Sequence, residues 1–252
     1  MIGPGARPPL APLRAIWRLS RSVLHGLHGL AIVLLRFGSL DLAARRARIR
    51  WWSAKMLRVL GIELRADGSL QVGAKLLVAN HVSWLDIIAL HAICPESRFV
   101  SKADVQRWPL VGRLVAAADT LYIERERRRD ALRVVHLMSA ALQAGDTVAA
   151  FPEGTTGDGL ALLPFHANLL QAAISTGTAV QPVALRYADA RHAVSPAAQW
   201  LGDTTLAGSL WKLARADGLV VHLRVLAPEA TANADRRTLA AQLRRQIEEA
   251  LR

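Results

Sequence analysis

The chain has 252 residues, 52% of them hydrophobic, with one cysteine and a formal net charge of +12 at pH 7. This length suits one large domain, or a domain with an appendage, and the hydrophobic fraction is low for a protein with many membrane spans. The single cysteine, Cys94, excludes an intrachain disulfide, and such a residue is more often a small buried hydrophobe than a reactive thiol.

The positive charge is concentrated near the N-terminus. Residues 1–60 contain eleven Lys and Arg residues and one acid, Asp41, so they carry +10 while the other 192 residues carry +2. Trp, Leu, Ile and Val lie between these bases, a mixture typical of helices in the headgroup region of an anionic bilayer. The longest apolar run, residues 30–35, is far shorter than the roughly 20 residues that a membrane span needs. No nucleic-acid motif accompanies the bases, so nucleic acid is not an expected partner.

We therefore expect residues 1–60 to form a basic membrane tether of two helices, 13–37 and 41–60, that lie on or dip into one leaflet. Packing of these helices on the rest of the protein, without membrane contact, stays open as the alternative. Residues 61–252 are expected to form the catalytic domain. Within it Gly61, Asp67-Gly68 and Gly73 predict a short hairpin-like stretch.

Short apolar runs then alternate with helical patterns along the chain. The predicted strands are 76–79, 98–101, 120–123, 147–151, 179–185 and 219–225. The predicted helices are 84–92, 106–117 with an interruption at Pro109, 129–143, 165–175 and 235–251. This alternation predicts the α/β class, with a mixed, mainly parallel sheet flanked by helices, next to the N-terminal two-helix membrane-binding element.

A histidine and an aspartate follow the first of these strands. His81 and Asp86 are five residues apart, across a strand end and the first turn of a helix, where open α/β sheets place their ligand-handling groups. A neutral imidazole can take the proton of a hydroxyl that attacks a carbonyl, and a carboxylate behind it fixes its tautomer. By itself the pair is weak evidence, because Asp86 could serve only as a helix cap and His81 only as a loop residue.

Three further segments carry candidate site residues. Phe151 to Thr156 follows a buried strand and offers glycine, a carboxylate and hydroxyls. Arg125 follows another strand and could pair with a phosphate, or belong to the solvated basic run after it. Pro182 lies in an apolar strand, where a place in the core is the simpler explanation.

Together the four segments resemble the blocks of the glycerolipid acyltransferase superfamily, in particular its bacterial 1-acyl-sn-glycerol-3-phosphate (lysophosphatidic acid) acyltransferases. The first block, N-H-x-x-x-x-D, is matched by Asn80, His81 and Asp86, and the F-P-E-G-T block by residues 151–155. The aromatic-Ile-x-Arg block is matched by Tyr122, Ile123 and Arg125, and the Pro-Val block by Pro182 and Val183. The resemblance covers about residues 60–190.

The resemblance implies a role for each matched residue. His81 is the base and Asp86 its orienting partner, while Asn80, Arg125, Glu153, Gly154, Thr155 and Pro182 contact substrate, with Arg125 on a phosphate. It implies direct attack by a lysolipid hydroxyl on the thioester of acyl-CoA or acyl carrier protein, with no metal, no cofactor and no covalent acyl-enzyme. It also implies phospholipid biosynthesis at the cytoplasmic face of the bacterial inner membrane, by a peripheral or monotopic protein.

One departure from the family pattern concerns the acceptor. Many members that bind a phosphate acceptor have Arg and Ser after F-P-E-G-T, where this chain has Thr156 and Gly157. Lysophosphatidic acid, giving phosphatidic acid, is the first expectation, and a lyso-ornithine lipid or another lysophospholipid is the alternative. A catalytically dead membrane-binding protein is the alternative from another class. A serine esterase is not expected, because the G-x-S-x-G nucleophile elbow is absent.

Overall fold

The computed structural model describes residues 11–123 and 128–252. The predicted phosphate contact Arg125 therefore lies outside the described residues. A seven-stranded sheet with the order β1-β7-β6-β2-β5-β3-β4 forms the centre of the fold. Five of its strand pairs are parallel and one, β6 with β7, is antiparallel, which confirms the predicted mixed, mainly parallel sheet. The strands are β1 (Ile62–Asp67), β2 (Lys75–Ala79), β3 (Ser97–Lys102), β4 (Leu121–Ile123), β5 (Thr147–Ala150), β6 (Val180–Ala188) and β7 (Leu219–Val225).

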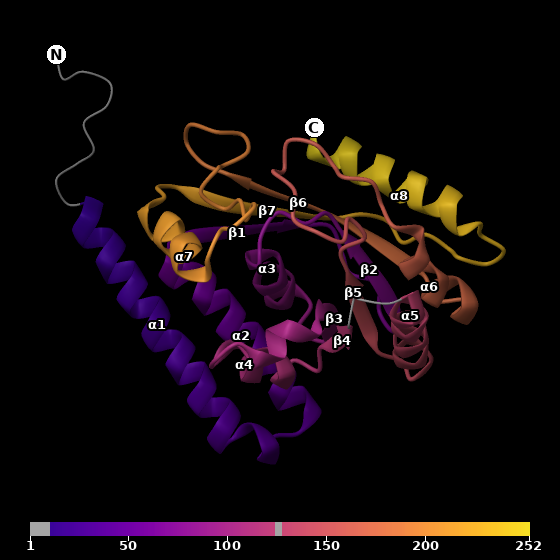
Figure 1. Cartoon of the computed structure of the whole chain (residues 1–252), viewed down its shortest axis with the longest axis horizontal. Helices are drawn as coiled ribbons and strands as arrows, with labels where there is room; N and C mark the ends of the chain where they lie inside the picture. Colours follow the sequence, from indigo (N-terminus) through magenta and orange to yellow (C-terminus); the bar gives the residue numbers. More distant parts are fainter. Residues whose placement is uncertain (1–10, 124–127) are drawn as a thin grey trace.

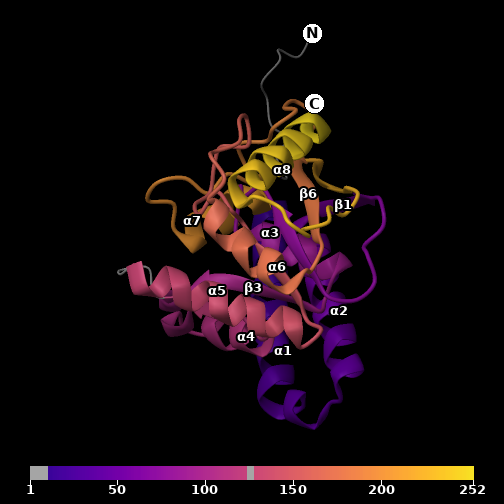
Figure 2. The same ribbon diagram turned by 90° about the vertical axis from the view of Figure 1, so that its right-hand side faces the viewer.

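Helices cover both faces of the sheet (Figure 1). One face packs against α2 (Leu42–Leu60), α3 (Leu85–Ile93) and α7 (Leu206–Arg215). The other packs against α5 (Arg128–Gln143), α6 (Gln171–Thr176) and α8 (Arg236–Leu251), which are nearest the viewer in Figure 2. The central strands β2 and β5 are buried along their whole length, as expected for strands covered on both faces. The sheet thus separates two hydrophobic cores, and the α3 face is the one that carries the predicted base.

One sequence expectation was wrong. The stretch that begins at Gly61 is no hairpin, because β1 pairs in parallel with the distant β7, with Ile62 opposite Leu219. The glycines only turn the chain at either end of this edge strand, so their pattern could not reveal its partner. Residues 206–215, for which the sequence predicted no element, form helix α7, whose N-terminus is capped by the Thr205 hydroxyl. The predicted break at Pro109 is confirmed, since a short 3₁₀ turn (Ala103–Arg107) precedes it and α4 (Val111–Ala117) follows.

The two N-terminal helices form an outer hairpin. Helix α1 (Ala11–Leu35) packs on α2 and α7, and Asp41 caps the start of α2. The hairpin is fixed by a reciprocal pair, in which the His25 imidazole meets the Trp52 carbonyl at 3.0 Å and the Trp52 indole N–H donates to the His25 carbonyl. A side chain at Gly29 would collide with the Trp52 indole, with 2.2 Å between a Cβ and the indole nitrogen, so glycine permits this close approach.

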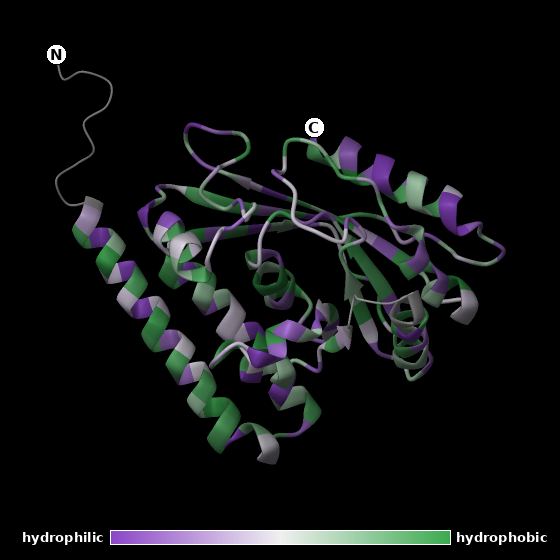
Figure 3. Ribbon diagram, in the orientation of Figure 1, coloured by the Kyte–Doolittle hydropathy of each residue, from purple (hydrophilic) through white to green (hydrophobic). Residues whose placement is uncertain are grey.

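The outer face of α1 is unusually apolar for a surface helix. Its buried side contains small or polar residues such as Ala15, Ser22 and His25, whereas Trp17 and Leu24 are more than 60% exposed. Figure 3 shows hydrophobic residues along the whole of α1 and most densely near its C-terminal end. Within the described ranges, no helix is long and apolar enough to cross a membrane. The last turns of α2 belong to the core, because Met56, Leu57 and Leu60 pack against α3 and the sheet.

Candidate active site

The predicted base lies where two neighbouring parallel strands end. Strands β2 and β5 pair in register, from Lys75 with Thr147 to Val78 with Ala150. The loop after β2 carries His81, and the loop after β5 carries Phe151 and Glu153. Because both loops leave the same edge of the sheet, segments 70 residues apart in sequence meet there.

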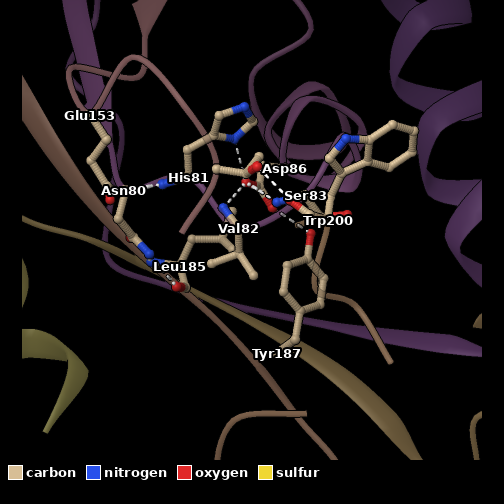
Figure 4. A network of polar contacts seen from close by, with 10 residues as sticks. Asn80, His81, Val82, Ser83, Asp86, Glu153, Leu185, Tyr187 and Trp200 are labelled. Atoms are coloured by element: carbon tan, nitrogen blue, oxygen red, sulfur yellow. Dashed lines mark hydrogen bonds and ion pairs between the residues drawn. The ribbon is translucent and has the colours of Figure 1, made fainter. Parts of the chain in front are cut away.

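His81 and Asp86 form a hydrogen-bonded pair (Figure 4). The imidazole Nδ1 lies 2.7 Å from Asp86 Oδ2. The carboxylate is fully buried, while the imidazole keeps 19% of its surface exposed. An ionised carboxylate can only accept, so Nδ1 carries the hydrogen and the lone pair is on Nε2. The buried acid therefore selects the tautomer in which the outward nitrogen can take a proton.

Three further donors hold the Asp86 carboxylate. Oδ2 also accepts from the backbone N–H groups of Val82 at 2.7 Å and Ser83 at 2.9 Å. Oδ1 accepts from the Tyr187 hydroxyl at 2.8 Å. Asp86 thus anchors the loop before α3 and orients His81. It is not the cap of α3, because the N-cap position is Trp84 and makes no side-chain cap hydrogen bond.

Aromatic rings pack against one face of the His81 imidazole. The His81 ring stacks on Phe151, and Phe99 lies beyond it with ring centroids 5.8 Å apart. Phe99 in turn meets the edge of His91, whose centroid is 4.8 Å away. Burial lowers the pKa of His91 to about 4, so this second histidine is neutral and packs as a core residue.

Glu153 holds the main chain of the catalytic loop. Its Oε1 accepts from the His81 backbone N–H at 2.8 Å and its Oε2 from the Leu163 backbone N–H at 3.0 Å. Burial raises the pKa of Glu153, against the lowering effect of these two hydrogen bonds. The Gly157 backbone N–H also donates to the His81 carbonyl, at 2.8 Å, and so joins the same two loops. The carboxylate that the sequence assigns to substrate is therefore occupied by backbone amides.

Asn80 and Pro182 also lie in structural positions. The Asn80 amide donates to the Leu185 carbonyl and accepts from the Leu185 N–H, both at 2.8 Å, which continues the β2–β6 pairing beyond the end of β2. Pro182 is buried in β6, between Gln181 and Val183. Strand alternation puts it on the face of Val180 and Ala184, which pack against the α5, α6 and α8 side, away from His81.

Gly154, Thr155 and Thr156 line the loop beside the pair. Gly154 has a φ of +72°, and a Cβ there would lie 3.1 Å from the His166 ring, so glycine suits this turn. Thr155 is exposed. The Thr156 hydroxyl donates to the Trp200 carbonyl, and the Trp200 backbone N–H donates to the Val82 carbonyl at 3.1 Å. Thr156 thus fastens the loop around Trp200 to the catalytic loop.

A histidine that is hydrogen-bonded to a buried carboxylate, at the strand ends of this sheet, has the geometry expected for a general-base site. Comparisons with known proteins identify the family. The family model described as Acyltransferase matches residues 62–186. A lyso-ornithine lipid O-acyltransferase of Pseudomonas aeruginosa is 38% identical over 96% of this chain and 94% of its own. A 1-acyl-sn-glycerol-3-phosphate acyltransferase of Neisseria meningitidis is 36% identical over 77% of this chain and 74% of its own.

The chain therefore belongs to the acyltransferase family, and both of these relatives are named as acyltransferases of lysolipids. Among solved structures, the 1-acyl-sn-glycerophosphate acyltransferase of Thermotoga maritima has the same fold. The TM-score is 0.71 at 18% identity, over 96% of this chain and 95% of that one.

Proposed function

We propose that His81 is the general base that activates the lysolipid hydroxyl for attack on an acyl thioester. The observation that carries this proposal is the 2.7 Å contact between His81 Nδ1 and the buried Asp86 carboxylate, with the imidazole itself partly exposed. The hydroxyl proton passes to Nε2 as the oxygen bonds to the thioester carbon. The tetrahedral intermediate then collapses, the carbon–sulfur bond breaks, and the imidazolium returns the proton to the thiolate of CoA or acyl carrier protein.

The oxyanion of that intermediate needs hydrogen-bond donors. The backbone N–H groups just after Asn80 lie nearest to His81, but they are already occupied. His81 donates its own to Glu153, and Val82 and Ser83 donate theirs to Asp86. In our proposal these three amides fix the shape of the loop and the oxyanion donors come from elsewhere. Asn80 and Glu153 then act as positioning residues, while Gly154, Thr155 and Arg125 remain the proposed acceptor contacts.

For the acceptor we favour a lyso-ornithine lipid, with lysophosphatidic acid as the second candidate. The arginine that often follows F-P-E-G-T is replaced by Thr156, whose hydroxyl is engaged by the Trp200 carbonyl. An acceptor without a phosphate dianion needs that cation least. The relative matched over nearly its whole length is also named for lyso-ornithine lipid. The order of the two sequence expectations is thereby reversed.

An acceptor panel tests this proposal. The purified full chain would receive lyso-ornithine lipid, lysophosphatidic acid or lysophosphatidylethanolamine, each with an acyl-CoA and with an acyl carrier protein donor. Mass spectrometry of the lipid products gives kcat/KM for each pair. A preference for lyso-ornithine lipid is expected. A higher kcat/KM for lysophosphatidic acid would overturn the acceptor assignment, and no product from any acceptor would overturn the reaction itself.

We further propose that the helices within residues 1–60 hold the domain 61–252 at the cytoplasmic face of the bacterial inner membrane. Exposed Trp17 on α1 lies under the Arg21 guanidinium, 5.5 Å from its ring centroid, an arrangement suited to a headgroup layer. The N-terminal basic charge complements an anionic surface. This placement would bring the His81 site to lipid acceptors that stay in the bilayer.

A further inference from the structure

Tyr187 lies behind the His81–Asp86 pair on β6, five residues beyond Pro182 of the Pro-Val motif and outside that motif. It belongs to β6, where it is 1% exposed and stands opposite Val221 of β7. Its side chain points to the α3 face of the sheet, and its hydroxyl donates to Asp86 Oδ1 at 2.8 Å (Figure 4). The contact joins residues 101 positions apart in sequence.

The two carboxylate oxygens of Asp86 accept different numbers of hydrogen bonds. Oδ2 receives the His81 ring and two backbone amides, whereas Oδ1 receives the Tyr187 hydroxyl. Without that hydroxyl, no other hydrogen bond from the described residues reaches Oδ1. A buried carboxylate oxygen that loses its donor is destabilised in the ionised form, because water does not replace the bond.

We propose that Tyr187 is a positioning residue of the acyl transfer, which fixes the rotation and the ionised state of Asp86 and through them the basicity of His81. This inference rests on the proposed role of His81 as the base. Tyr187 itself touches neither the reacting hydroxyl nor the thioester, so its effect passes entirely through the carboxylate.

The phenol is suited to this task because it keeps its proton. Burial first, and then the neighbouring Asp86 carboxylate, hold the pKa of Tyr187 well above its ordinary value. It therefore donates at every pH at which the enzyme would work. Two titratable side chains of the described residues interact with the His81–Asp86 pair, Glu153 after β5 and Tyr187 on β6. From α7, the Ser209 hydroxyl accepts a hydrogen bond from the indole N–H of Trp84, at the start of α3. Serine does not titrate in this pH range.

The sign of the effect follows from the same contacts. In Tyr187→Phe, Asp86 loses a donor and becomes more basic. A more basic carboxylate binds the imidazolium more strongly. This raises the pH at which His81 loses its proton and becomes a competent base. The acid limb of the plot of kcat/KM against pH is therefore expected to shift to higher pH, by about half a pH unit or more.

Tyr187→Phe is the informative variant because it removes only the hydroxyl and keeps the buried ring. We expect kcat to fall roughly tenfold with KM little changed, since a hydrogen bond to a charged group is lost. Incorporation of 4-aminophenylalanine at 187 restores an N–H donor at the same ring position and is expected to recover part of kcat. Thr231→Val is the matched control. It removes a buried hydroxyl that donates to the Ala173 and Thr178 carbonyls, remote from the site.

A measurement without turnover separates this inference from the proposed reaction. The imidazole pKa of His81 can be read by NMR, with its signals identified by their absence in His81→Ala. A higher imidazole pKa in Tyr187→Phe, with no change in Thr231→Val, is the expected result even if no acceptor is acylated. An unchanged imidazole pKa and acid limb, with only a lower melting temperature, would show that Tyr187 merely fills the core and would overturn the inference.

Discussion

The imidazole of His81 lies flat on the ring of Phe151, with centroids 4.0 Å apart and planes inclined by 8°. Asp86 holds one edge of the imidazole and Phe151 covers one face, so the ring has few ways to turn. The phenylalanine at the head of the F-P-E-G-T block therefore helps to hold the His81 ring in place. An aromatic ring in this place restricts His81 without competing for its hydrogen bonds.

Replacing Phe151 by a smaller side chain is expected to let the His81 ring move. Phe151→Leu keeps an apolar residue but removes the flat ring, so we expect kcat to fall roughly tenfold while KM for the acceptor changes little, as for a loss of about 1.4 kcal/mol in orientation. Phe165→Leu is the matched control, because Phe165 packs on the opposite core. Steady-state kinetics of the two variants decide the matter. Equal losses in both would mean that only general packing was disturbed.

Removal of the pair itself gives the largest expected effect. His81→Ala should lower kcat at least about 100-fold, since general base catalysis contributes 10²–10⁴ in rate. Asp86→Asn is expected to be comparably damaging, because an amide oxygen no longer enforces the required tautomer. The chain supplies a control in His192, an exposed histidine whose Nδ1 lies 2.9 Å from the Asp189 carboxylate. Turnover retained in His81→Ala, as in His192→Ala, would refute the assignment of the base.

The sequence predicted the strands around the site well because apolar runs between turn signals are local features. It also placed His81 and Asp86 correctly at the end of a buried strand. It could not show that Asn80 and Glu153 bind backbone groups, since their partners Leu185 and Leu163 are distant or unmarked in sequence. Tyr187 was missed for the same reason. A tyrosine in an apolar strand has no pattern that reveals a carboxylate 101 residues away.

His91 should make the protein sensitive to mild acid. Burial lowers its pKa to about 4 in the folded state, whereas the unfolded chain takes the proton near the ordinary value of about 6.5. The unfolded state therefore binds more protons between these values, and stability falls as the pH drops through that window. The expected loss between pH 7 and pH 5 is about 2 kcal/mol. Urea unfolding at both pH values measures it.

Replacing His91 provides the comparison. His91→Leu has no titrating group at this position, so the difference in unfolding free energy between pH 7 and pH 5 should shrink by most of that amount. His192→Ala is the control, because His192 is an exposed histidine whose surroundings differ from those of His91. An identical pH dependence in wild type and His91→Leu would exclude His91 as the source.

Thr156 offers a test of acceptor choice. Thr156→Arg introduces the cation that many phosphate-acceptor relatives carry after F-P-E-G-T, and it is expected to raise the ratio of lysophosphatidic acid to lyso-ornithine lipid turnover several-fold. The same change removes the hydroxyl bond to the Trp200 carbonyl. Thr156→Val removes that bond without adding charge and is therefore the control. A ratio that shifts equally in both variants would attribute the effect to the loop and not to the arginine.

The membrane contact is best tested by point substitutions on α1. Deleting residues 1–60 would also remove Met56, Leu57 and Leu60 from the core, so loss of binding would not be informative. Trp17→Ser with Leu24→Ser changes only side chains that are 62% and 64% exposed. We expect weaker binding to phosphatidylglycerol-containing vesicles in a flotation assay, because buried apolar area drives interfacial binding. Leu132→Ser on α5, where the side chain is 66% exposed, is the matched control. If the α1 variant and the control float equally well, the membrane surface lies elsewhere on the protein.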